Sequence, residues 1–264
     1  MDLQLTGKRA IVTGASRGIG WAVARALAAE GAELVLVARD PAALRAAASR
    51  LPAGTRALAL PADTTDDAAV RAAVARAVAE LGGVDILVNS AAEPARPGSL
   101  RPLAQSVDDD LRTEVETKVL GYLRFARAVA PDMAARRWGR IINISGLAAR
   151  QTGNTFGAIR NVAVAAMTKN LADELGPAGI NVTVVHPGTT VTERTPATIA
   201  EYASARGITP ADAEAALAAN VTIGRLVTAA EVADVVTFLA SPRSVAITGD
   251  AIAVGGGARG AIHY

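Results

Sequence analysis

Short runs of β-branched and aliphatic residues alternate with longer, alanine-rich amphipathic runs along the whole chain. The short runs have the length of buried strands, and the longer runs repeat apolar positions every three to four residues, as helices do. We predict strands at 9–13, 33–38, 57–60, 84–89, 140–145, 180–186 and 250–254, and helices at 18–30, 41–51, 66–81, 106–136, 154–175 and 229–240.

This alternation predicts a single Rossmann-like doubly wound α/β domain over residues 1–264, with a seven-stranded parallel sheet and helices on both faces. The stretch 189–224 is too long for an ordinary connection and carries weak helical patterns at 198–205 and 211–219. We interpret it as a lid over the substrate.

Composition narrows the class of protein. The chain has 264 residues, no cysteine and a net charge of +2, which excludes thiolate chemistry and argues against a nucleic-acid partner. The N-terminus lacks the apolar core of a signal peptide, and no run reaches the ~18 apolar residues of a membrane span. We expect a cytoplasmic protein that binds neither a membrane nor nucleic acid, and we predict no metal site.

Residues 13–20 read TGASRGIG, directly after the first predicted strand and at the start of the first predicted helix. Gly14 allows a tight turn, Gly18 lets the backbone approach a pyrophosphate, and Gly20 permits close packing of helix on strand. The N–H groups of the helix start and the helix dipole attract phosphates. This stretch therefore predicts a dinucleotide-binding loop.

The three-residue spacing between the first two glycines resembles that of the short-chain dehydrogenase/reductase family. The likeness continues as VNSAA at 88–92, INIS at 142–145, HPGTTVT at 186–192 and VGGGA at 254–258, and so covers essentially the whole chain. The resemblance implies that Asp63 lies beside the adenine and that Asn89 and Ala91 line the cofactor cleft. It also implies that the nicotinamide carboxamide is held by Pro187, Gly188, Thr190 and Thr192. The expected cofactor-binding residues are Gly14, Ser16, Arg17, Gly18, Ile19, Gly20, Arg39, Asp63, Asn89, Ala91, Lys118, Pro187, Gly188, Thr190 and Thr192.

The end of the second strand selects the dinucleotide. Arg39 follows this strand, and Arg17 lies within the glycine loop, so two guanidinium groups are available for a 2′-phosphate. This favours NADP(H). In the alternative, both arginines are surface charges and Asp40 binds the ribose.

The family's usual Tyr-x-x-x-Lys pair is missing. The tyrosine position falls on Gly157, the lysine position on Asn161, and the family's serine position on Ser145 or Gly146. Hydride transfer at a carbonyl needs a proton partner, because an alkoxide is strongly disfavoured at neutral pH.

A second departure accompanies the first. Three residues before Gly121, where most members carry asparagine, this chain has Lys118. Lysine and asparagine have thus exchanged places, which resembles the ketoreductase domains of polyketide and fatty-acid synthases. We therefore predict Lys118, Ser145 and Asn161 as the catalytic residues. The alternative for Lys118 is a surface position on an amphipathic helix.

The sequence offers several candidates for the proton donor. Ser145, a water held by Lys118 and Asn161, and Lys118 itself are candidates. Further candidates are Thr152, Thr155, His186, Tyr202 on the lid, and His263 or Tyr264 reaching a neighbouring subunit, whereas Tyr122 is expected in the core or at a helix interface.

The sequence thus predicts an NADP(H)-dependent oxidoreductase that interconverts a carbonyl, or a similar polar double bond, and its reduced form. The expected pocket, from 91–99, 146–157 and 189–224, suits a mainly apolar small molecule, although Arg96 and Arg194 could bind an acidic tail. The alternative is a catalytically inactive nucleotide-binding protein. A non-redox lyase or dehalogenase is disfavoured, since the glycine loop would then have little purpose. Apolar surface on 106–136 and 154–175 predicts a homodimer or homotetramer.

Overall fold

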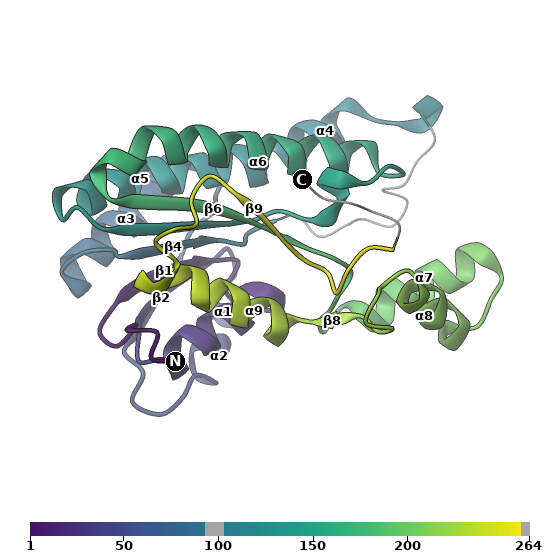
Figure 1. The fold of residues 1–264 in the computed structure, drawn as a ribbon, viewed down its shortest axis with the longest axis horizontal. Coiled ribbons are helices and arrows are strands. Elements are labelled where there is room, and N and C mark those ends of the chain that lie inside the picture. The colour runs from purple at the N-terminus through teal and green to yellow at the C-terminus, as the bar shows by residue number, and fades with distance from the viewer. Residues whose placement is uncertain (93–102, 260–264) are drawn as a thin grey trace.

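A computed structural model describes residues 1–92 and 103–259 (Figure 1). Seven strands form one parallel sheet in the order β3-β2-β1-β4-β5-β6-β9. This confirms the predicted fold class. The strands are β1 (Arg9–Thr13), β2 (Glu33–Ala38), β3 (Ala57–Pro61), β4 (Ile86–Asn89), β5 (Gly139–Ile144), β6 (Ile180–Pro187) and β9 (Ala251–Val254).

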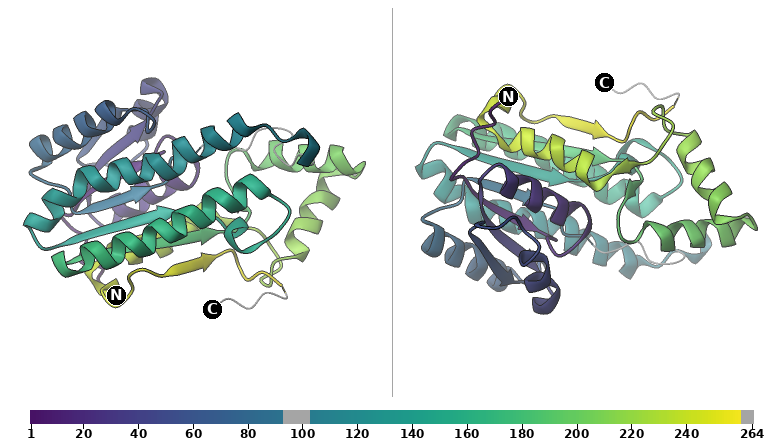
Figure 2. Two further views of the ribbon diagram at one scale, coloured as in Figure 1. Left: turned by 90° about the horizontal axis from the view of Figure 1, so that it is seen from above. Right: turned by 90° about the horizontal axis from the view of Figure 1, so that it is seen from below.

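Helices cover both faces of this sheet (Figures 1 and 2). On one face lie α1 (Gly18–Ala29), α2 (Pro41–Ala48) and α9 (Ala229–Ala240). On the other lie α3 (Asp67–Leu81), α5 (Gly121–Ala135) and α6 (Thr155–Leu175). Alternate residues of β2 serve the two cores: Leu34 and Leu36 join one apolar cluster, whereas Val35 and Val37 join the other. A strand buried on both faces therefore needs an almost continuous apolar run.

The strand order reverses between β1 and β4, and in such sheets ligands bind at the carboxyl edge beside this switch point. The Thr13 hydroxyl ties the two strand ends together by accepting hydrogen bonds from the backbone N–H groups of Ser90 and Ala91 (3.0 and 3.1 Å). A side chain at Gly14 would bring its Cβ within 2.9 Å of the Ala91 backbone. Glycine is thus required where the two loops cross.

The prediction of one uninterrupted α-helix over 106–136 is wrong. The chain forms α4 (Asp108–Glu114), a π-helical turn η2 (Val115–Leu120) and then α5. Thr64 helps to fix this turn, because its hydroxyl donates to the Thr117 carbonyl (3.1 Å). Gly121 makes room for Thr64, since a Cβ at this glycine would lie 2.8 Å from the threonine Cβ. π-turns inside α-helices are often found at functional sites.

The 189–224 segment lies beyond the carboxyl edge of the sheet (Figure 1). It contains β7 (Thr190–Val191), α7 (Thr195–Arg206) and α8 (Pro210–Ala219), and β7 pairs with β8 (Val227–Thr228). The two helices share a small apolar cluster of their own, built on Ile199, Ala203 and Ala213. The pattern predicted both helices within a few residues of their observed limits.

Other differences from the predicted elements concern their ends. Helix α2 stops at Ala48, three residues early, and β4 starts at Ile86, two residues late. Short 3-10 turns complete the fold at η1 (Leu103–Gln105), η3 (Leu147–Arg150), η4 (Gly176–Ala178) and η5 (Pro242–Ser244). Within 1–92 and 103–259, no helix has the length and apolarity needed to cross a bilayer.

Candidate active site

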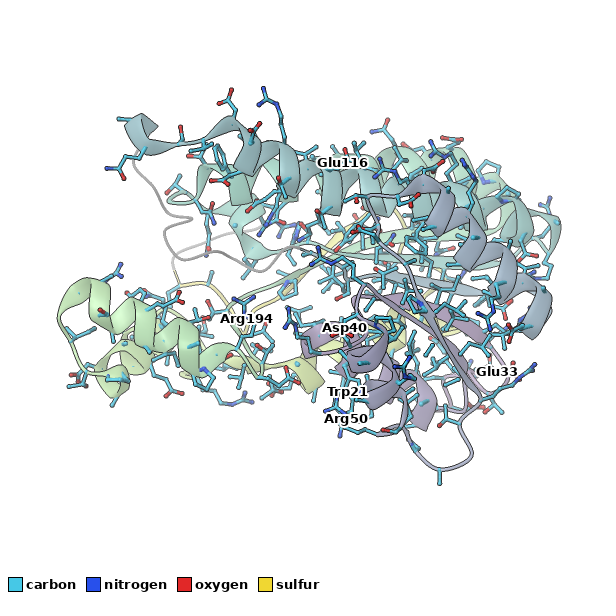
Figure 3. The ribbon with its side chains drawn as sticks, turned by 180° about the vertical axis from the view of Figure 1, so that it is seen from behind. Trp21, Glu33, Asp40, Arg50, Glu116 and Arg194 are labelled. Carbon is cyan, nitrogen blue, oxygen red and sulfur yellow. The ribbon has the colours of Figure 1, made fainter. Side chains whose placement is uncertain are left out.

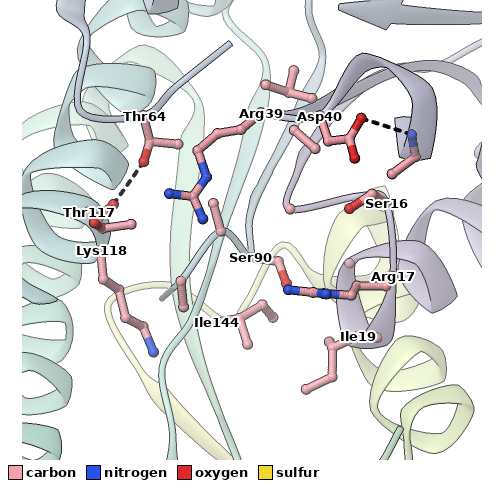
Figure 4. A pocket seen from close by; sticks show the side chains of 18 of the residues that line it. Ser16, Arg17, Ile19, Arg39, Asp40, Thr64, Ser90, Thr117, Lys118 and Ile144 are labelled. Carbon is pink, nitrogen blue, oxygen red and sulfur yellow. Dashed lines mark hydrogen bonds between the residues drawn. The ribbon is translucent and has the colours of Figure 1, made fainter. Parts of the chain in front are cut away.

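A crevice of ≈ 620 Å³ opens at the carboxyl edge beside the switch point (Figures 3 and 4). Arg194, just before α7, and Asp40, just after β2, both line it. The remaining lining comes from the glycine loop, the ends of β2 to β5 and the π-turn, and it includes Gly14, Ser16, Arg17, Gly18, Ile19, Gly20, Arg39, Thr64, Ser90, Ala91, Thr117, Lys118, Tyr122, Ile144, Ser145, Thr192 and Glu193.

The glycine loop leaves space where phosphates are expected. Gly18 has a φ of 58°, a left-handed conformation that favours glycine. A Cβ placed on it would meet only the Thr192 methyl group, at 3.8 Å. By contrast, a Cβ on Gly20 would lie 2.4 Å from the Gly14 carbonyl oxygen. The loop is therefore tightly folded on itself and has space beside the Gly18 Cα, which is the geometry expected of a pyrophosphate-binding loop at a helix start.

Two arginines reach into this crevice, Arg17 from the glycine loop and Arg39 from the end of β2 (Figure 4). The neighbouring Asp40 caps α2, because its Oδ1 accepts hydrogen bonds from the backbone N–H groups of Ala42 (2.8 Å) and Ala43 (3.2 Å). The carboxylate that would serve a ribose is thus held by the first turn of α2, and both guanidinium groups face the crevice.

Several expected cofactor residues lie outside the crevice lining: Asp63, Asn89, Pro187, Gly188 and Thr190. The Asp63 carboxylate accepts bonds from the backbone N–H and the hydroxyl of Thr65 (both 2.9 Å) in the turn after β3. Asn89 is fully buried and donates to Asn143 Oδ1 (2.9 Å). The Asn89 side chain therefore bonds to the neighbouring strand β5 and does not line the crevice.

The three predicted catalytic residues meet in one hydrogen-bond network. Lys118, on the π-turn, is 4% exposed, and its Nζ donates to the Ser145 carbonyl oxygen and to Asn161 Oδ1, both at 3.0 Å. The Ser145 hydroxyl donates to the backbone carbonyl of Asn161 (3.1 Å). The π-turn, β5 and α6 thus hold a single amine at the crevice wall (Figure 4).

Burial lowers the pKa of Lys118 to about 7, with a further lowering by the charge of Arg160 and an opposing effect of Glu114. An uncharged amine has two N–H donors and one lone pair. The two acceptors on the protein match those two donors, which leaves the lone pair, or the third N–H of the charged form, for the crevice. Lys118 can therefore give up or take a proton near neutral pH.

The space of the missing tyrosine is partly used by a helix cap. Asn154 precedes α6, and its Oδ1 accepts a hydrogen bond from the Gly157 N–H (2.8 Å). A Cβ at Gly157 would lie 2.6 Å from the Asn154 amide nitrogen. Similarly, a Cβ at Gly146 would lie 3.0 Å from the Asn161 amide nitrogen. At both positions, therefore, a side chain would crowd the neighbouring asparagine, and glycine leaves room for it.

Tyr122 was expected in the core or at a helix interface; it is buried, and it also lines the crevice. Its hydroxyl donates to the Ile144 carbonyl oxygen (3.0 Å), and burial raises the pKa of this phenol. It is thus a poor proton donor at neutral pH.

The other proton-donor candidates among the described residues lie outside the crevice lining. Tyr202 packs in the α7–α8 cluster with the Arg206 guanidinium 3.7 Å from its ring centre. Thr152 and Thr155 are exposed and lie outside the crevice lining, and His186 is buried in β6. Arg96, His263 and Tyr264 lie outside the described residues.

Sequence reasoning missed Glu193, Thr64 and Thr117 in this crevice. The Glu193 carboxylate accepts a hydrogen bond from the Gly18 N–H (3.1 Å). Nothing in the sequence pairs these two residues, which are 175 positions apart. Thr64 and Thr117 meet only because the π-turn brings the Thr117 carbonyl towards the end of β3.

The fold and the crevice together define a dinucleotide-binding protein of the doubly wound α/β class. A family model described as enoyl-(acyl carrier protein) reductase matches residues 14–259. The chain belongs to the short-chain dehydrogenase/reductase family.

Two reductase relatives illustrate this membership. The chain is 38% identical to the short-chain reductase protein NovJ of Streptomyces niveus over 250 residues, which is 94% of this chain and 92% of that protein. The L-sorbose reductase of Gluconobacter frateurii, solved with NADPH and L-sorbose, superposes with a TM-score of 0.91 at 31% identity and covers 99% of this chain and 100% of its own.

A third similar protein is also a reductase. An actinorhodin polyketide ketoreductase variant solved with NADPH superposes with a TM-score of 0.88 at 32% identity. The superposition covers 95% of this chain and 96% of that one. The protein is thus similar to reductases over nearly its entire length.

Proposed function

We propose that this protein is an NADP(H)-dependent oxidoreductase that interconverts a carbonyl group and its reduced form on a mainly apolar small molecule. The observation that carries the proposal is the Lys118 amine, which is held by Ser145 and Asn161 at the wall of a crevice that also contains the glycine loop. The similarity to reductases solved with NADPH supports the choice of cofactor.

The glycine loop would hold the pyrophosphate, and Arg17 and Arg39 would hold the 2′-phosphate, because two exposed guanidinium groups favour this dianion over a bare hydroxyl. Ala91, Lys118 and Thr192 line the same crevice and would contact the remainder of the cofactor. When bound, the cofactor supplies or accepts the hydride at the substrate carbon.

Lys118 would exchange the proton with the substrate oxygen, directly or through one water. Its amine is the ionisable group at the crevice wall whose pKa, at about 7, suits transfer in both directions. Ser145 and Asn161 fix the direction of its remaining proton or lone pair by accepting its other two hydrogen bonds. The Lys118 amine, held by these contacts, would take the role of the phenol that Gly157 cannot supply.

The 189–224 segment would close over the substrate as a lid. Its first residues, Thr192 to Arg194, already line the crevice, while α7 and α8 form a unit with its own apolar cluster. Arg194 is exposed at the crevice mouth, where it would meet an acidic group on a substrate.

A second copy of the chain would cover the exposed apolar side chains of α6. Ile159 and Val162 are 45% and 49% exposed on this helix. We expect a homodimer or homotetramer. Sedimentation equilibrium tests this, and a stable monomer would contradict it.

Turnover is tested by following NADPH absorbance with a panel of ketones and aldehydes. We expect oxidation of NADPH with at least one apolar carbonyl compound, and a loss of about 10-fold or more in kcat/KM for Lys118→Ala. Lys169→Ala is the matched control, because Lys169 pairs with Asp173 at the surface. Full activity of Lys118→Ala would remove Lys118 from the reaction. Tight NADPH binding with no turnover of any compound would contradict the enzymatic function.

A further inference from the structure

A partly buried ion pair lies next to the residues of the network and is not explained by cofactor binding. Arg160 of α6 and Glu114 of α4 approach to 2.9 Å, and their side chains are only 16% and 18% exposed. Arg160 directly precedes Asn161, and Glu114 is the last residue before the π-turn that carries Lys118. The pair therefore links α6 to the start of the π-turn.

Stability alone gives little reason for such a pair. Removing two charges from water costs about as much as their attraction returns, so apolar residues of similar size often serve a buried position as well or better. Arg160 Nε and Glu114 Oε2 are also buried without a hydrogen-bond partner among the residues that the structure describes, so the two groups meet as opposite charges only. Both facts suggest that the charges of Glu114 and Arg160 serve a purpose other than stability.

Their charges act on Lys118 in opposite directions. Arg160 disfavours a proton on the Lys118 amine, and Glu114 favours one, with Arg160 the stronger of the two. The groups that accept hydrogen bonds from the amine are neutral: the Ser145 carbonyl just after β5 and the Asn161 side chain of α6. The Tyr122 phenol of α5, which lines the same crevice, is neutral as well. The charges that act on Lys118 thus belong to one cation and one anion, and these are paired with each other.

We propose that Glu114 and Arg160 are positioning residues that set the protonation state of Lys118. Arg160 engages the Glu114 carboxylate, which lies about one helical turn before Lys118, and keeps it from forming an ion pair with the amine. A Lys118–Glu114 pair would fix the proton on the amine and draw it away from Asn161. The consequence for catalysis rests on the proposed function, whereas the effect on Lys118 does not.

The chain contains only three lysines, Lys8, Lys118 and Lys169, so the amine can be observed directly. Protein labelled with 13C at lysine Cε gives one NMR signal for each, and Lys8→Arg and Lys169→Arg assign the remaining signal to Lys118. The chemical shift of this signal, followed against pH in the full-length protein without cofactor, gives the titration midpoint of Lys118.

The two single variants should move this midpoint in opposite directions. Arg160→Met removes the cation and frees Glu114, so the midpoint should rise by about one pH unit or more. Glu114→Gln leaves Arg160 without its partner, so the midpoint should fall. Loosening of the fold would admit water and raise the midpoint in both variants, which separates a structural effect from an electrostatic one.

Shifts in the same direction, or shifts below about 0.3 pH unit in both variants, would overturn the inference. Should Arg160→Met not fold, Glu114→Gln alone tests the inference: a fall of the midpoint supports it, and a rise overturns it. The measurement needs no turnover. Opposite shifts in a protein that reduces no carbonyl compound would therefore refute the proposed function and leave this inference intact. Unchanged midpoints in an active enzyme would refute this inference and leave the proposed function intact.

Discussion

Glu193 Oε2 accepts a hydrogen bond from the backbone N–H of Gly18, with 3.1 Å between the two atoms. The donor belongs to the start of α1, where the glycine loop is shaped for a pyrophosphate. A carboxylate of the protein therefore lies where the cofactor's phosphates are expected. Because Glu193 is exposed and begins the approach to α7, it can leave this position without disturbing the core.

Glu193→Gln should tighten NADPH binding, because the neutral amide competes less well than a carboxylate for the positive end of a helix. We expect a decrease in Kd of about two- to fivefold, which corresponds to ~0.3–1 kcal/mol. Fluorescence titration with NADPH measures it. Glu201→Gln, an exposed change on α7, serves as the control. An unchanged or weaker affinity of Glu193→Gln would show that the contact does not compete with the cofactor.

Arg39→Ala and Arg17→Ala should each weaken NADPH binding by about 10- to 100-fold, the range for a lost hydrogen bond to a charged group. Affinity for NADH should change little, since NADH lacks the 2′-phosphate. Titrations with both dinucleotides measure this difference. Arg45→Ala is a matched control, because Arg45 is exposed on α2 and lies outside the crevice lining. Equal losses for NADH and NADPH would show that the arginines do not bind the 2′-phosphate. An unchanged NADPH affinity in both variants would support the alternative in which the arginines are surface charges and Asp40 binds the ribose.

Lys118→Met should stabilise the protein below neutral pH. The folded pKa of Lys118, about 7, lies below the ordinary value of 10.5, so the unfolded chain binds more protons between these two values. The free energy of unfolding of the wild type should therefore rise relative to that of the variant, by up to about 1.4 kcal/mol per pH unit in this window.

Urea unfolding at pH 6, 8 and 9.5 measures this trend. The advantage of Lys118→Met should be largest at pH 6 and smallest at pH 9.5, while kcat/KM is reduced throughout. Lys169→Met provides the comparison at a lysine that is 61% exposed. A stability difference that is the same at all three pH values would mean that Lys118 is ordinarily charged in the folded protein.

The effect of Gly157→Ala on stability should depend on whether Asn154 is present. Alanine favours a helix interior over glycine by about 1 kcal/mol, but its Cβ would displace the Asn154 cap, which contributes about the same amount. We expect little gain in the wild type and a gain of up to about 1 kcal/mol in an Asn154→Ala background. Thermal unfolding of the four proteins gives the coupling energy. Equal gains in both backgrounds would show that the cap and the glycine are independent.

The sequence predicted the sheet well because its inner strands are buried on both faces and so are almost continuously apolar, as Leu34 to Val37 of β2 illustrate. The meeting of Lys118, Ser145 and Asn161 could also be predicted, since each lies at a position defined by a neighbouring motif. The π-turn could not, because one extra residue in a helix leaves the pattern of polar and apolar positions nearly unchanged. The Glu193–Gly18 and Glu114–Arg160 contacts depend on side-chain placement across distant segments, for which the sequence carries no local signal.

The π-turn at Val115–Leu120 contains one residue more than an α-helical turn would use. The extra residue is taken up within the turn, so shortening this stretch by a single residue would restore regular winding without turning α4 relative to α5. Lys118 lies inside the turn, however, and its contact with Asn161 depends on the path of the backbone there. We therefore expect the loss of one codon here to displace the amine from Asn161 while leaving both flanking helices intact.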